Sequence, residues 1–119
     1  MKKILLASLF LLLAGGVFAQ LDVKAVGSQI LAKLTPALAL ADDQQPQVAD
    51  AVADFLTKKA EILPLKATDA SAYASKFNIL NGGLIGKLKT ILVAKQMTSF
   101  LMLKPKSGDT GNVLSQLFF

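Results

Sequence analysis

The chain has 119 residues, of which 53% are hydrophobic, and its 13 basic residues against 8 acidic ones give a formal net charge of +5. All the basic residues are lysine, and Arg, Cys, His and Trp do not occur. The composition therefore excludes a thiolate nucleophile, an imidazole base and a thiolate or imidazole metal site, together with the guanidinium fork that binds phosphate. We expect a protein that is not an enzyme and has no cofactor, metal or evident small-molecule substrate.

The first 19 residues have the layout of a secretory signal peptide. Lys2 and Lys3 precede an apolar run, and the small residues Val17 and Ala19 stand three places and one place before the expected cleavage site. The apolar run is shorter than the roughly 20 residues of a membrane-spanning helix. We therefore expect export to the periplasm or the medium, with residues 20–119 as a single mature domain.

The first part of this domain predicts a helix followed by a separate turn. Apolar residues recur every three or four positions through residues 21–34, which is typical of a helix. The Thr-Pro pair at residues 35–36 is typical of a helix start, so residues 36–40 are expected to form their own short turn. Asp42 is expected to cap the next helix, with Gln45 at capping-box spacing.

The second predicted helix is amphipathic and ends near residues 63–64. Its polar face repeats with a mean spacing of about 3.6 residues, the α-helical period, and consists of Asp43, Gln47, Asp50, Asp54, Lys58 and Glu61. We interpret these residues as a solvated face that includes an ordinary i,i+4 pair between Asp54 and Lys58. Calcium loops instead place acidic residues close together in a turn around a glycine.

The third predicted helix is long and contains glycines. Thr68 is expected to be its cap, with Asp69 in the first turn. From Tyr73 to Ile91 the apolar residues keep the helical period, and they keep it through the Asn-Gly-Gly sequence at residues 81–83. Two interior glycines cost roughly 2 kcal/mol relative to alanine, but a turn would rarely preserve this phase. We therefore predict one helix rather than a hairpin.

The remaining sequence predicts two further helices. Residues 94–103 form the fourth helix, which stops before Pro105, residues 106–109 form a loop, and residues 113–119 form a short, very apolar C-terminal helix. The sequence shows no alternating strand pattern. The expected fold class is all-α, a small bundle or hairpin of three to four amphipathic helices plus the C-terminal helix.

The charged and apolar residues suggest a surface that binds other proteins. The positive charge is spread along the chain, which argues against nucleic-acid binding, and the lysines at positions 58, 59, 87 and 89 are interpreted as solvent-exposed charges. An apolar binding or dimer face is predicted from six residues: Phe55, Phe77, Phe100, Leu117, Phe118 and Phe119. The alternative for the two terminal phenylalanines is packing onto the helical core.

Two short segments share a pattern. Leu40 precedes Gln44 by four residues, Leu92 precedes Gln96 by four residues, and an amphipathic helix containing a phenylalanine follows each. This pattern resembles the doubled L-T-x-x-Q motif of the Spy/CpxP-like family of periplasmic proteins, and the resemblance covers roughly residues 30–103. Alanine and valine stand where that family has threonine.

The resemblance implies a dimer of thin helical hairpins with a concave surface. It also implies an ATP-independent chaperone or envelope-stress accessory whose partners are unfolded or envelope proteins. From the residues themselves we expect an exported, non-enzymatic helical binding protein. Two alternatives stay open: a structural or scaffolding homo-oligomer of the envelope, and an amphipathic protein of the membrane surface.

Overall fold

A computed structural model describes residues 22–106, 109 and 111–119. In these residues the chain is helical and contains no strand, which confirms the all-α prediction. The helices are α1 (Val23–Leu38), α2 (Gln44–Ile62), α3 (Leu65–Thr68), α4 (Ala70–Ile91), α5 (Ala94–Met102) and α6 (Ser115–Phe118). The predicted signal peptide, residues 1–19, lies outside the described residues.

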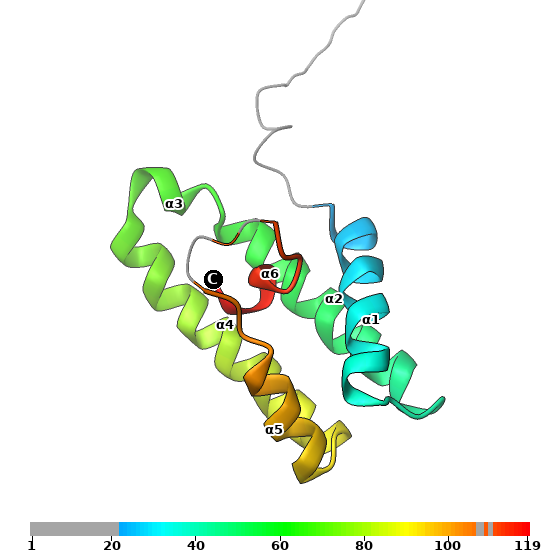
Figure 1. The fold of residues 1–119 in the computed structure, drawn as a ribbon. Coiled ribbons are helices and arrows are strands. Elements are labelled where there is room, and N and C mark those ends of the chain that lie inside the picture. Colours follow the sequence, from blue (N-terminus) through cyan, green and yellow to red (C-terminus); the bar gives the residue numbers. More distant parts are fainter. Residues whose placement is uncertain (1–21, 107–108, 110) are drawn as a thin grey trace, which may run out of the picture.

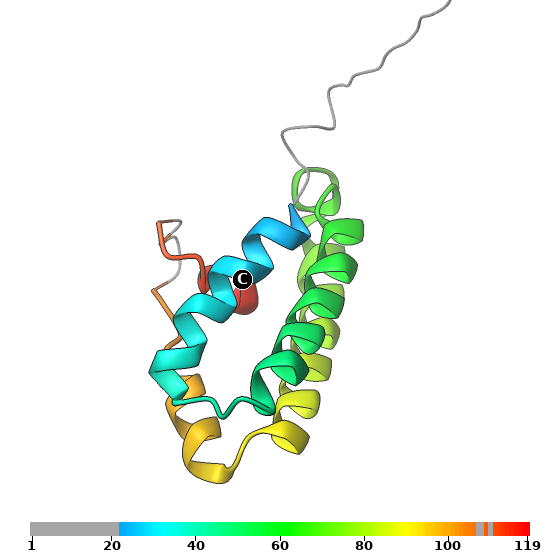
Figure 2. The same cartoon turned by 90° about the vertical axis from the view of Figure 1, so that its right-hand side faces the viewer.

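The helices pack around the pair formed by α2 and α4. These two helices run side by side and are joined at one end by α3, α1 packs against α2, and α5 folds back toward α1 (Figure 1). Seen from the side, α1, α5 and α6 lie on the same side of the α2–α4 pair, with α6 behind α1 (Figure 2). The connection from α1 to α2 and the connection from α4 to α5 lie together at one end of the molecule (Figure 2).

One apolar core joins the elements. Each long helix contributes the residues of its apolar stripe, so the predicted phase of α4 is also the phase that is buried. The fully buried side chains are Ile30, Leu34, Val48, Val52, Leu56, Leu88, Phe100 and Leu117. Burying one such side chain stabilises the fold by about 1.5–3 kcal/mol. Because the chain has no cysteine and therefore no disulfide, its stability depends mainly on this apolar core.

Helix α1 does not break at its Thr-Pro pair, and the separate turn predicted for residues 36–40 is wrong. Pro36 lies inside α1, which continues to Leu38. Proline in the last turn removes only one helical hydrogen bond, and the hydroxyl of Thr35 donates to the carbonyl of Leu31 at 2.8 Å. The helix is followed by Ala39, whose φ of 51° is in the left-handed region that commonly ends helices.

Helix α4 is one continuous helix through the glycines at 82 and 83, as the apolar phase predicts. Its cap, however, is one residue later than expected. The carboxylate of Asp69 accepts a hydrogen bond from the Ala72 N–H at 3.0 Å, whereas Thr68 ends α3 and donates its hydroxyl to the carbonyl of Pro64. The short helix after Pro64 extends through Thr68, so Asp69 is the first residue there with a non-helical backbone, as a cap requires.

Two further boundaries agree with the predictions to within one residue, since α2 ends at Ile62 and α5 covers residues 94–102. Helices α1 and α6 each begin two residues later than predicted, at Val23 and Ser115. Among the described helices, none combines the length and the hydropathy that crossing a bilayer requires.

Candidate functional site

The structure brings the two motif glutamines together. The Nε2 of Gln44 donates to the Oε1 of Gln96 at 2.8 Å, and the Nε2 of Gln96 donates to the Oε1 of Gln44 at 3.0 Å. Two side chains that are 52 residues apart in the sequence therefore form a reciprocal carboxamide pair. We call this pair the glutamine junction.

Each glutamine of the junction also closes the start of its own helix. The Oε1 of Gln44 accepts from the Ala41 N–H at 2.9 Å, and the Oε1 of Gln96 accepts from the Val93 N–H at 3.0 Å. These bonds satisfy an N–H group that helix starts otherwise leave free. The prediction that Asp42 caps α2 is wrong. Helix α2 begins at Gln44, and the side chain of Gln44, rather than that of Asp42, accepts the hydrogen bond at this helix start.

The remaining donor of each carboxamide closes the end of a helix in the other half of the molecule. Gln44 Nε2 donates to the carbonyl of Ile91, the last residue of α4, and Gln96 Nε2 donates to the carbonyl of Leu38, the last residue of α1, both at 3.1 Å. Two side chains thus hydrogen-bond to four helix ends: the starts of α2 and α5 and the ends of α1 and α4. All donors and lone pairs of both carboxamides are used.

The glutamine junction has a structural role rather than a chemical one. The motif leucines, Leu40 and Leu92, are buried in the core beside it. An open groove of about 650 Å³ lies over the junction and includes Asp43, Lys95 and Ser99 in its lining. Because the carboxamides already make their full set of hydrogen bonds, they hold the groove in shape and offer a ligand no free group.

A smaller hollow of about 220 Å³ lies between α2 and α4 and is more apolar. We call it the α2–α4 recess; it is lined by Ala51, Asp54, Phe55, Lys58, Ile79, Leu80, Gly83, Leu84 and Lys87. A glycine at position 83 leaves this wall without a side chain, and a Cβ built there would meet no atom within 4 Å. At the recess, Ile79 exposes 74% of its surface.

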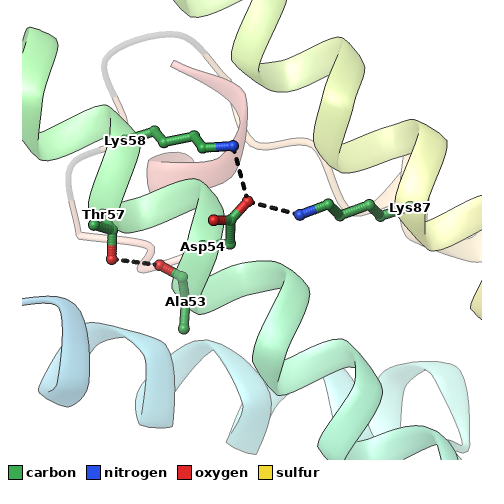
Figure 3. A network of polar contacts seen from close by, with 5 residues as sticks. All are labelled: Ala53, Asp54, Thr57, Lys58 and Lys87. Atoms are coloured by element: carbon green, nitrogen blue, oxygen red, sulfur yellow. Dashed lines mark hydrogen bonds and ion pairs between the residues drawn. The ribbon is translucent and has the colours of Figure 1, made fainter.

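The recess has a charged rim. Asp54 Oδ2 lies 2.6 Å from Lys87 Nζ and 3.2 Å from Lys58 Nζ (Figure 3). The hydrogen bonds from Lys87 and Lys58 hold the pKa of Asp54 below its usual value. The predicted i,i+4 pair is confirmed, and a cross-helix pair to Lys87 accompanies it. Two ammonium groups share one carboxylate, so the rim carries a net positive charge.

The other acidic residues of α2 lie apart from this rim. Asp43 and Asp50 are exposed on the surface of the helix. Within the described ranges, no three acidic side chains come together in a group that could hold a metal ion.

The six residues predicted to form an apolar face are distributed through the inside of the molecule. Phe55, Phe77, Phe100 and Leu117 are buried core residues. The two terminal phenylalanines are half-buried, and the ring of Phe118 lies 5.4 Å from that of Phe100 between centroids. These six residues therefore pack inside the molecule. The large apolar residues that are exposed lie elsewhere: Ile79 at the recess, and Val93, Leu101 and Met102 on or next to α5.

Lys59 is the residue that the sequence analysis missed. It is only 2% exposed, so its interpretation as a surface charge is wrong. Its Nζ donates to the carbonyl and to the Oε1 of Gln116, at 2.8 and 2.9 Å, and lies 5.5 Å from the centre of the Phe77 ring. Burial, with a smaller contribution from the charge of Lys66, lowers the pKa of Lys59 to about 8.

A signal for this burial is present in the sequence. The apolar stripe of α2 runs through Val48, Val52, Phe55 and Ile62, and Lys59 occupies the position where the helical period requires another apolar residue. In most proteins, a lysine at such a position buries its aliphatic stem and keeps its ammonium group in water. The sequence alone therefore favours an exposed charge for Lys59.

Comparisons with known proteins supply no relative. No family model, no curated protein and no solved structure matches this chain. The resemblance to the Spy/CpxP-like family stays a prediction based on the spacing of the motif leucines and glutamines.

Proposed function

We propose that this chain is an exported, non-enzymatic binding protein that captures apolar side chains of partly unfolded polypeptides without using nucleotide. The observation that carries the proposal is the α2–α4 recess. Its volume of about 220 Å³ exceeds the roughly 150 Å³ in which an apolar protein cavity binds benzene. The recess is thus large enough for a leucine or phenylalanine side chain.

The surroundings of the recess fit such a partner. Ile79 extends the apolar surface beyond the recess, because most of its side chain is in water. Lys58 and Lys87 are about half-exposed, and their net positive charge attracts acidic segments of a client while it keeps this apolar area hydrated. A mixed apolar and basic surface suits a binding protein that accepts many clients rather than one.

Export and chaperone-like activity rest on the sequence. The expectation of export comes from the signal-peptide layout of residues 1–19, and the chaperone-like or envelope-stress role comes from the motif resemblance. The recess adds a physical site at which such a protein would contact its client.

The test is suppression of aggregation. We expect the purified protein, in excess over a client that is unfolding, to reduce the light scattering of the client in buffer without nucleotide. Ile79→Asp should remove most of this effect, since a carboxylate replaces the apolar side chain at the recess. Met102→Asp is the matched control, because Met102 is 80% exposed but lies on α5 and does not line the recess.

Two outcomes contradict the proposal. An unchanged aggregation curve in the presence of excess protein means that the recess captures no client. A stable oligomer that binds no dye for apolar surfaces means that a second copy covers the recess, and the scaffolding alternative then replaces the chaperone-like one. Molecular mass in solution, measured on the same samples, separates these outcomes.

A further inference from the structure

The C-terminal segment, residues 113–119, lies in a site built by α2 and α4. Leu117 is fully buried and Leu114 is 5% exposed. Three side chains of the two helices donate hydrogen bonds to the segment, and we call these three the clasp: Lys59, Tyr73 and Asn81. Helix α6 itself lies on the same side of the α2–α4 pair as α1 and α5 (Figure 2).

The clasp holds the main chain of the segment. Lys59 Nζ donates to the carbonyl of Gln116 at 2.8 Å, Asn81 Nδ2 donates to the carbonyl of Leu117 at 2.8 Å, and Tyr73 OH donates to the main-chain oxygen of Phe119 at 2.9 Å. A fourth bond, from Lys59 to Gln116 Oε1 at 2.9 Å, goes to a side chain.

Every residue has a main-chain oxygen, so three of the four hydrogen bonds do not depend on sequence, and only the bond to Gln116 Oε1 requires a particular side chain. The apolar part needs one large side chain at the place of Leu117.

The segment depends on the clasp for its position. Helix α6 has four residues, far fewer than an isolated helix needs in water. The other helices do not depend on the segment in the same way, because α1, α2, α4 and α5 contact one another directly. Loss of the segment would leave these direct contacts in place, and it would uncover the part of the core that Leu114 and Leu117 fill.

We propose that the clasp is a binding site for a short apolar peptide of an unfolded client, and that the C-terminal segment is the occupant that a client replaces. This inference rests on the proposed function for the nature of the client, but it uses a different site from the recess. The chemistry of the resident segment defines the ligand: a peptide of a few residues that offers three main-chain oxygens and a leucine-like side chain.

Competition makes the site measurable. A peptide can enter only the fraction of molecules in which the clasp is empty, so its apparent Kd equals the intrinsic Kd divided by that fraction. A substitution in the segment raises the empty fraction and tightens peptide binding. A substitution in the clasp weakens the peptide and the segment together. The two kinds of variant therefore act in opposite directions only if peptide and segment share one site.

The experiment uses the full chain and a fluorescent peptide with the sequence of residues 112–119. We expect Leu117→Ala in the chain to tighten peptide binding, measured by fluorescence anisotropy, by at least about tenfold. Leu101→Ala is the control, because Leu101 is half-exposed on α5, and it should leave binding unchanged. Adding Asn81→Ala to Leu117→Ala should weaken binding several-fold, since one donor to the peptide is lost.

The helical circular dichroism of every variant is measured, and Phe118→Ala replaces Leu117→Ala if the latter unfolds, since Phe118 is only half-buried. The proposal is overturned if a helical Leu117→Ala chain binds the peptide no better than the wild type. It is also overturned if Asn81→Ala has no effect on binding. A chain that dimerises reversibly and ignores the peptide would show that a second copy, rather than a client, exchanges into the clasp.

The two proposals fail separately. If Leu117→Ala binds the peptide but neither it nor the wild type suppresses aggregation, the clasp stands and the chaperone-like function falls. If the wild type suppresses aggregation through Ile79 while the peptide never binds, the function stands and the clasp is only an internal contact.

Discussion

At the scale of single residues, the glutamine junction shows why these positions require a carboxamide. A glutamine side chain supplies two N–H donors and an oxygen with two lone pairs, and Gln44 and Gln96 use all of them on each other and on four backbone groups. A glutamate has the same shape but, when ionised, only accepts. The exchange of one atom therefore removes two hydrogen bonds without changing the volume.

We predict that Gln96→Glu lowers the free energy of unfolding by about 2–4 kcal/mol at pH 7, because the carbonyl of Leu38 and the Oε1 of Gln44 lose their donors. The folded protein disfavours the charged carboxylate, so its pKa is raised on folding. The penalty is then present at neutral pH and shrinks as acid protonates the group. Urea unfolding at pH 7 and pH 4 measures this. Gln29→Glu, at an exposed position of α1, is the control.

Lys59 makes a second prediction at this scale. Its pKa is about 8 in the folded protein and near 10.4 in an unfolded chain, so between these values the unfolded state binds more protons. The free energy of unfolding must then rise with pH across this window, by about 1–2 kcal/mol from pH 7.5 to 9.5. Lys59→Met should remove this rise, and denaturant titrations at several pH values check it. A wild-type stability that falls over this range would contradict the buried ammonium.

At the scale of helices, the spacing of apolar residues predicts where most helices lie and which face of each is buried. The helical period predicts α2, α4 and α5 with their buried faces, including the passage of α4 through two glycines. The sequence predicts the helix ends less closely, because several residues near each end can serve as caps. Thr68 and Asp42 are both good capping residues, and the structure uses the neighbouring Asp69 and the more distant Gln44. Pro36 is compatible both with the first turn of a new helix, which the sequence predicts, and with the last turn of α1, where the structure places it.

We predict that Asp69→Ala destabilises the protein by about 1 kcal/mol, because the N–H of Ala72 loses its acceptor at the start of α4. Thr68→Ala should change stability by less than about 0.5 kcal/mol, since its hydroxyl bonds only to a carbonyl in the exposed α3. Thermal unfolding of the two variants compares the neighbours directly. Equal losses would mean that both residues cap α4.

The glycines of α4 yield a prediction of the opposite sign. Gly82 and Gly86 are exposed in the middle of the helix, and a Cβ at either would meet no atom within 4 Å. Gly82→Ala and Gly86→Ala should each raise the free energy of unfolding by about 0.5–1 kcal/mol, because alanine loses less backbone entropy in a helix. Chemical denaturation measures the change, and a loss of stability would indicate that α4 bends or opens at that position.

At the scale of the whole molecule, the functional groups come from pairs of residues that the sequence does not identify. Lys59 meets Gln116 across 57 positions, and the α2–α4 recess combines residues from two helices. Periodicity assigns each residue to a face but not to a partner on another helix. The motif resemblance did single out Gln44 and Gln96, yet their contact with each other follows only from the packing of α1, α2, α4 and α5.

The one tyrosine of the chain, in a sequence without tryptophan, reports on the clasp. In the wild type we expect the fluorescence of Tyr73 and the helical circular dichroism to change together during urea unfolding, as in a cooperative two-state protein. In Leu117→Ala the tyrosine signal should change at a lower urea concentration, because the C-terminal segment detaches first. Coincident curves in the variant would contradict a segment that can leave by itself.

The glutamine junction also has a consequence for the order of folding. Its two side chains close a loop of about fifty residues, and the entropy of that closure has to be overcome before the paired amides stabilise anything. Helical hairpins form from neighbouring residues and can precede it. Substitutions at Gln44 or Gln96 should therefore accelerate unfolding and leave the refolding rate nearly unchanged, which is the kinetic signature of contacts made after the transition state.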